Sequence, residues 1–136
     1  MSREGVSGSA LVEGLRRALE ARPEIAFAYL HGSFERGEPY RDIDVAVWMD
    51  PTHGRVLDGV RYALDLSVDL QGALGAPIDV QVINEAPLAF RYHALRGRPI
   101  MVRDWEALHE VRARTWDAYF DFQPFARAHL REVLRG

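Results

Sequence analysis

The sequence of 136 residues contains no lysine and no cysteine, so all 17 basic side chains are arginine. Without cysteine, the chain has no disulfide bond, no thiolate zinc site and no cysteine nucleophile. Without lysine, a Walker-type phosphate loop and Schiff-base chemistry are excluded. Any cation that meets a phosphate in this protein must therefore be an arginine, a histidine, a backbone dipole or a bound metal.

Long apolar runs and basic runs are missing as well. The longest unbroken apolar run, Ile25 to Leu30, is far shorter than the roughly 20 residues that span a bilayer. The first residues carry no signal-peptide pattern, so we expect a cytoplasmic protein without membrane contact. The formal net charge of −3, spread without a basic cluster, argues against direct nucleic-acid binding.

The hydrophobic periodicity predicts one α/β (α+β) domain over residues 9–136, with helices packed on a small mixed β-sheet, after a flexible N-terminus at residues 1–8. Strands are expected at residues 25–31, 43–49, 78–84 and 99–103. Helices are expected at residues 9–22, 55–74 and 87–96, and from an N-cap at Asp104 through Phe122 with a kink near Pro124.

The most informative stretch joins the first two predicted strands. Gly32 and Ser33 end the first strand, a loop to Arg41 follows, and Asp42 and Asp44 open the second. Residues two apart on a strand project from the same face. Two carboxylates this close repel each other unless a cation lies between them, and Mg²⁺ commonly bridges carboxylates to substrate phosphates. The pattern therefore favours metal-assisted phosphate chemistry.

A third acid, Asp79, begins a later strand and also lies opposite that strand's apolar residues. If its strand neighbours the one that carries Asp42 and Asp44, the three acids converge and suit two metal ions. Asp79 could then also accept the proton of an attacking hydroxyl. Gly32 lets a phosphate approach the backbone, and the N–H groups around Ser33 could bind it.

These residues resemble the motifs of the minimal nucleotidyltransferases, the MNT family of the DNA polymerase beta-like superfamily. The family pattern is Gly-Ser, a loop that often contains Arg-Gly, then Asp-x-Asp, and a third Asp on a following strand. Here it reads Gly32-Ser33, Arg36-Gly37, Asp42-Ile43-Asp44 and Asp79. The resemblance covers about residues 10–135 and implies the nucleotidyltransferase fold. The loop between Ser33 and Asp42 is shorter than in many members.

The resemblance also implies an activity and a partner. Stand-alone members are similar to antitoxins that are encoded beside a HEPN-domain toxin, a helical ribonuclease. The implied reaction transfers AMP from ATP to a tyrosine hydroxyl of that toxin with two Mg²⁺ ions, within a hetero-oligomer. The residues implied for metal binding and catalysis are Asp42, Asp44 and Asp79, and those implied for nucleotide binding are Gly32, Ser33 and Arg36.

Two alternatives stay open. The chain could be an antitoxin that blocks its partner by contact alone, although three mutually repelling acids argue against a pure binder. It could also modify a small molecule, although the chain is short for a separate acceptor-binding domain.

Some residues allow two interpretations. Arg36 could contact a phosphate or pair with a neighbouring acid, and His31 could touch a phosphate or only end its strand. Gln81 shares the face of Asp79. The aromatic residues of the C-terminal region either pack on the domain or form a partner surface; they are Trp105, Trp116, Tyr119, Phe120, Phe122 and Phe125.

Overall fold

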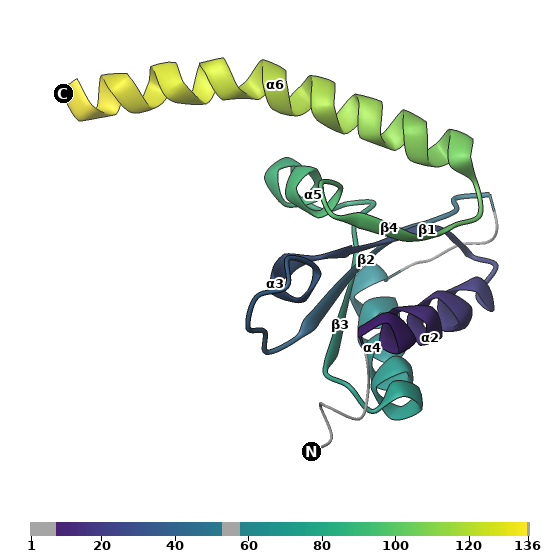
Figure 1. The fold of residues 1–136 in the computed structure, drawn as a ribbon. Helices are drawn as coiled ribbons and strands as arrows, with labels where there is room; N and C mark the ends of the chain where they lie inside the picture. The colour runs from purple at the N-terminus through teal and green to yellow at the C-terminus, as the bar shows by residue number, and fades with distance from the viewer. Residues whose placement is uncertain (1–7, 53–57, 136) are drawn as a thin grey trace.

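The computed structural model describes residues 8–52 and 58–135, which form a four-stranded sheet with helices on both faces (Figure 1). The elements in chain order are α2 (Gly8–Glu20), β1 (Ile25–His31), α3 (Gly32–Glu35), β2 (Ile43–Met49), α4 (Gly59–Leu74), β3 (Ile78–Val82), α5 (Leu88–Ala94), β4 (Arg98–Val102) and α6 (Trp105–Arg135). The predicted fold class is confirmed.

The sheet is mixed, with the strand order β3-β2-β1-β4. β1 pairs antiparallel with both β2 and β4, whereas β2 and β3 run parallel. Parallel neighbours need a crossover, and α4 provides it. The continuous apolar sequence of β1 follows from its position, because residues 25–30 are buried on both faces of the sheet.

Two hydrophobic cores hold the helices to the sheet. On one face, Leu15 and Leu19 of α2 and Leu66 of α4 pack against alternate residues of the strands. On the other face, α5 and α6 cover a second cluster that includes Phe27 and Leu108. Figure 1 shows this division, with α2 and α4 on one side of the sheet and α5 and α6 on the other. Because successive side chains of a strand point to opposite faces of the sheet, the strands contribute residues to both cores.

The helix ends follow from single residues. The Asp58 carboxylate accepts the backbone N–H of Arg61 at 3.1 Å and caps α4. Gly75 ends α4 in the left-handed conformation, with φ of 64°. The predicted N-cap Asp104 accepts the Ala107 N–H at 3.0 Å at the start of α6.

The structure differs from the sequence-based boundaries at several places. The predicted loop after β1 begins with one helical turn, α3, because the positive φ of Gly32 lets the chain turn and the Arg36 N–H bonds to the Gly32 carbonyl. β3 ends at Val82 rather than residue 84. α6 continues as one helix beyond Pro124, and the predicted kink there stays a prediction.

Two expectations fall partly outside the described residues. The predicted helix over residues 55–74 is described from Gly59, and residues 53–57 are not described. The flexible N-terminus lies almost entirely in residues 1–7, which are also outside the described part. Among residues 8–52 and 58–135, no helix combines the length and apolar character that crossing a membrane requires.

Candidate functional site

Asp44 and Asp79 lie opposite each other on the parallel strands β2 and β3. The sequence predicted this only on the condition that their strands are neighbours, and that condition is met. Asp42 precedes the first residue of β2, and its side chain is exposed. The structure therefore brings the three predicted acids to one end of the β2–β3 pair.

Gly32 lies directly against this acidic end. Its φ is 81°, and a Cβ atom built on it would lie 2.3 Å from Oδ2 of Asp44. Only glycine combines this backbone conformation with such a close approach. The first turn of α3, which also carries Ser33, is thereby held beside the Asp44 carboxylate.

Gln81 connects the acids to the end of β1. Its amide nitrogen donates to Oδ2 of Asp79 at 2.8 Å and to Oδ1 of Asp44 at 3.5 Å. Its carbonyl oxygen lies 3.0 Å from Nε2 of His31, which is then the donor because the amide nitrogen faces the acids. Gln81 therefore lies next to the acids, on the face that it shares with Asp79. His31 is linked to the acids through Gln81.

The electrostatics of Asp44 reflect its position between these groups. Burial raises the pKa of Asp44 above its ordinary value, and repulsion from Asp79 and Asp42 adds to the increase. His31 and the hydrogen bond from Gln81 act in the opposite direction. Charge is therefore costly at this carboxylate without a nearby cation.

No cluster of three or more acidic, histidine or cysteine side chains in the described part of the chain is arranged to hold a metal ion. The Asp79 carboxylate accepts a hydrogen bond from Gln81. Asp42 is also exposed at the start of its strand. The predicted metal site of Asp42, Asp44 and Asp79 accordingly stays a prediction.

A cationic pocket of about 220 Å³ adjoins Gly32 on the side of α5. Besides His31, Gly32 and the predicted Arg36, it is lined by His93 and Arg96, and its two arginines outnumber its one acid, Glu35. The predicted site did not include these last two residues. They reach the site because the chain after α5 packs tightly on β1: a Cβ on Gly97 would lie 2.2 Å from the Leu30 carbonyl oxygen. Both residues lie in the predicted helix over residues 87–96, but no pattern in the sequence places that helix beside the acids.

Arg36 pairs with a neighbouring acid, as one of its two interpretations expected, and its contact with a phosphate stays a prediction. It lines the cationic pocket, and its Nε donates to Glu38 at 3.1 Å. Both side chains are more than half exposed, so the ion pair stabilises the protein little. Arg36 can leave Glu38 for an anionic ligand at small cost.

The aromatic residues of the C-terminal region divide between the two interpretations. Tyr119 stacks on Tyr92 of α5 with ring centroids 3.7 Å apart, and Trp116 packs at 4.9 Å from the same ring. Three others are more than half exposed, and the side chain of Phe125 lies outside the described part. The exposed ones are Trp105, Phe120 and Phe122.

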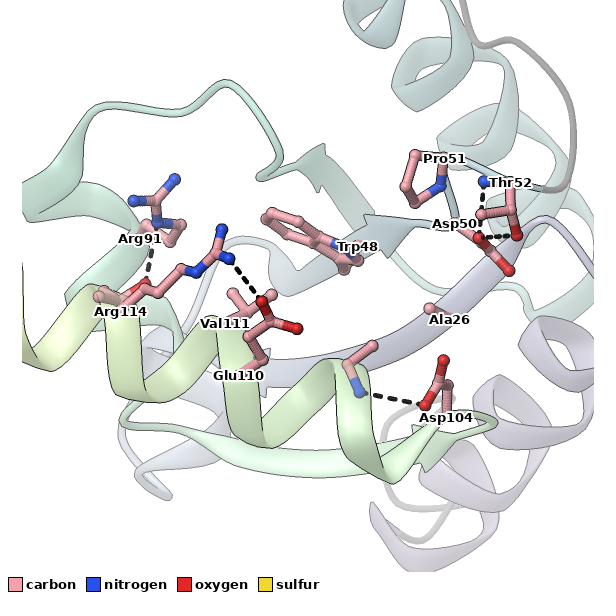
Figure 2. A pocket seen from close by; sticks show the side chains of 12 residues that line it. Ala26, Trp48, Asp50, Pro51, Thr52, Arg91, Asp104, Glu110, Val111 and Arg114 are labelled. Atoms are coloured by element: carbon pink, nitrogen blue, oxygen red, sulfur yellow. Dashed lines mark hydrogen bonds and ion pairs between the residues drawn. The ribbon is translucent and has the colours of Figure 1, made fainter.

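A larger cavity of about 430 Å³ lies away from the acids, between the sheet and the start of α6 (Figure 2). Its charged groups already have partners within the chain. Arg91 donates to Thr115 and Arg114 pairs with Glu110, and Figure 2 shows these contacts around Trp48. We therefore place the candidate site at the acids and not in this cavity.

Comparison with known proteins identifies the class. Residues 13–106, more than half of the chain, match the family model "Polymerase beta, Nucleotidyltransferase", and the chain belongs to this nucleotidyltransferase family. The superfamily that the motifs resembled is thereby confirmed. No curated protein matches the chain.

Solved structures of similar fold are toxin–antitoxin complexes. A chain of the MntA–HepT complex has a TM-score of 0.70 at 18% identity, over 93% of this chain and 98% of that one. A toxin–antitoxin structure with AMP-PNP gives 0.72 at 20%, over 90% and 98%. A complex of a tri-AMPylated Shewanella oneidensis HEPN toxin with its MNT antitoxin gives 0.70 at 19%, over 93% and 98%. At these identities the likeness shows the fold.

Proposed function

We propose that this protein is a Mg²⁺-dependent nucleotidyltransferase that transfers AMP from ATP to a hydroxyl of a partner protein. The observation that carries the proposal is the pairing of Asp44 with Asp79 across β2 and β3, with Asp42 two residues upstream and Gly32 against Asp44. Three acids at one sheet end beside a glycine turn are suited to metal-assisted phosphoryl chemistry.

The donor chemistry of the acids fits Mg²⁺. Carboxylate oxygens are the protein ligands that this ion prefers, and Asp42, Asp44 and Asp79 would hold it. A bound ion would offset the burial and the repulsion from neighbouring acids that raise the pKa of Asp44. When bound, the metal neutralises phosphate charge and polarises the reacting phosphorus. The hydrogen bond from Gln81 to Oδ2 of Asp79 leaves other lone pairs of that carboxylate for an ion.

The triphosphate is assigned to the side of α3 and α5. The positive φ of Gly32 opens the turn α3 beside the Asp44 carboxylate, and Ser33 lies in the same turn with its backbone N–H and hydroxyl as possible donors to a phosphate. The pocket beyond them carries Arg36, Arg96 and His93. In a chain without lysine, the two arginines supply the positive charge for the leaving pyrophosphate, and a ring N–H of His93 can donate a hydrogen bond to it.

The reaction is an in-line displacement at the α-phosphorus. The acceptor hydroxyl oxygen forms a bond to that phosphorus, and the bond to the bridging oxygen of the β-phosphate breaks. Pyrophosphate leaves with the electron pair. Asp79 is exposed on the edge strand and accepts or orients the proton of the hydroxyl.

The proposed partner is a HEPN-domain toxin, and the proposed acceptor is a tyrosine of that toxin. Support comes from the solved structures of similar fold, one of which contains a tri-AMPylated HEPN toxin with an MNT antitoxin. Another was solved with the ATP analogue AMP-PNP. Such a reaction would make this protein an antitoxin that acts by modification.

The test is the intact mass of the partner. The protein is incubated with Mg²⁺, ATP and the HEPN-domain protein that co-purifies with it. We expect one or more AMP additions with the wild type and none with the Asp42→Ala/Asp44→Ala double variant. Equal inhibition of the partner by both proteins without any mass change would show a contact antitoxin and would overturn the proposal.

A further inference from the structure

A second, apolar groove adjoins the acids and is separate from the cationic pocket. It has a volume of about 610 Å³ and runs between α4 and the edge strand β3. Val60 and Leu64 of α4 and Phe90 of α5 line it, and Asp79 is part of its wall. The two α4 side chains are 73% and 60% exposed. Adjacent apolar side chains with this exposure in a groove are typical of a binding surface.

The charge of this groove is opposite to that of the nucleotide pocket. Three acids, Asp58, Asp79 and Glu85, stand among the described residues that line it, and no arginine or histidine does. A triphosphate would be repelled here, whereas an apolar segment with neighbouring basic side chains would be attracted. The groove is continuous with the proposed reaction centre through Asp79, which lines it.

The edge of β3 beside the groove is not free to pair with an added strand. An extended peptide that joins a sheet needs free backbone groups at its edge. At the β3 edge, the Val80 N–H already donates to the Ser67 hydroxyl at 2.8 Å, and the Ile78 carbonyl already accepts from Gln71 at 2.8 Å. α4 therefore covers this part of the edge.

We propose that the groove between α4 and β3 is the docking site for the acceptor segment of the partner protein. The occupant is a segment with an apolar side chain between Val60 and Phe90, a hydroxyl directed to Asp79, and basic residues opposite Asp58 and Glu85. The inference rests on the proposed function, since it names the substrate side of the same centre. In this arrangement, AMP is transferred from ATP bound at the cationic pocket to an acceptor bound in the acidic groove.

The test compares two substitutions on the same helix. Leu64→Arg places a cation in the groove, whereas Val68→Arg changes a side chain that is 67% exposed one turn further along, outside the groove. Because both positions are exposed, both variants should keep the wild-type melting temperature. The probes are AMP-PNP for the nucleotide side and the co-purifying HEPN-domain protein for the acceptor side.

We expect Leu64→Arg to lose at least about tenfold in affinity for the HEPN-domain protein and in the rate of its modification. Its affinity for AMP-PNP should be unchanged, and Val68→Arg should match the wild type in all three measurements. Glu85→Gln should weaken partner binding more at low salt than at high salt, as expected for attraction between exposed charges.

The other possible results separate failure of the docking site from failure of the proposed function. If Leu64→Arg modifies the HEPN-domain protein at the wild-type rate, the docking site is overturned but the proposed function is not. A loss of AMP-PNP affinity in Leu64→Arg alone assigns the groove to the nucleobase and also overturns the inference. If the wild type modifies nothing, the proposed function fails, and the affinities of the two variants for the HEPN-domain protein still decide the docking site. Absence of any wild-type binding to that protein overturns it.

Discussion

Gly32 and Asp44 are in such close contact that a Cβ atom on the glycine would lie 2.3 Å from the aspartate Oδ2. The contact joins the turn after β1 to the acid on β2, so the proposed phosphate site and the proposed metal site share one boundary. Neither residue can change its position without moving the other. This relationship gives the sharpest test of the site.

We expect Gly32→Ala to abolish AMP transfer and to lower the free energy of unfolding by about 1–2 kcal/mol, because alanine is strained at this positive φ. Gly37→Ala is the matched control, since Gly37 has φ of 74° but nothing within 4 Å of a built Cβ. It should lose similar stability and keep its activity. Urea unfolding and the mass assay measure the two effects. Equal activity of both variants would show that the contact with Asp44 has no catalytic importance.

Arg96 should matter more for ATP than Arg36. Arg96→Ala removes a cation from the pocket beside Gly32, and we expect the KM for ATP to rise roughly tenfold with a smaller change in kcat. Arg36→Ala should raise it less, because the Arg36 side chain is more than half exposed, so water already screens its charge. Arg17→Ala, on the surface of α2, is the charge control. An effect of Arg17→Ala as large as that of Arg96→Ala would point to long-range attraction instead of a pocket contact.

Removal of the metal should abolish the reaction. Chelation with EDTA should lower the rate at least about a hundredfold. Without the ion, the negative carboxylates and the negative triphosphate repel each other. Mg²⁺ should also raise the melting temperature of the wild type in the absence of nucleotide, since a ligand that binds the folded state stabilises it. The same titration should leave Asp44→Ala unchanged. A shift of equal size in that variant would assign the ion to another site.

The pKa of Asp44 predicts a pH dependence of stability in EDTA. Its folded-state pKa is raised, chiefly by burial, so the folded state disfavours the charged carboxylate. The contribution of Asp44 to the free energy of unfolding is therefore fully present below the ordinary aspartate pKa. It is lost as the pH rises through the raised pKa of the folded state. We expect Asp44→Asn, which cannot ionise, to be more stable than the metal-free wild type at neutral pH and not at low pH. Melting curves of both proteins against pH test this, and an equal difference at every pH would contradict it.

Much of the fold could be predicted from local patterns. Leu11, Leu15 and Leu19 repeat at helical spacing and are buried, and the apolar run of β1 indicated a strand buried on both faces. Asp104 and Gly75 marked helix ends because capping depends on the residue itself. The boundary at Val82 was less visible, because the apolar pattern continues to Ile83 after the pairing ends.

The candidate site was predictable where its residues share a strand and not where packing joins distant segments. Asp42 and Asp44 are two residues apart, and their common face follows from strand geometry. The strand order decides whether Asp79 joins them, and no local pattern fixes that order. His93 and Arg96 reach the site only because Gly97 packs on the end of β1. The cationic character of the pocket was therefore hidden in the sequence.

The parallel pairing of β2 and β3 also has a consequence for how the protein folds. Hairpin strands can meet early, because a short turn joins them, whereas Asp44 and Asp79 meet only after α4 has crossed over and docked. The Ser67 hydroxyl and the Gln71 amide of that helix bind the backbone of β3, so we expect docking of α4 and pairing of the two strands to be coupled. The acidic centre thus depends on a long-range contact, and we expect it to form later in folding than the antiparallel pairing of β1 and β2.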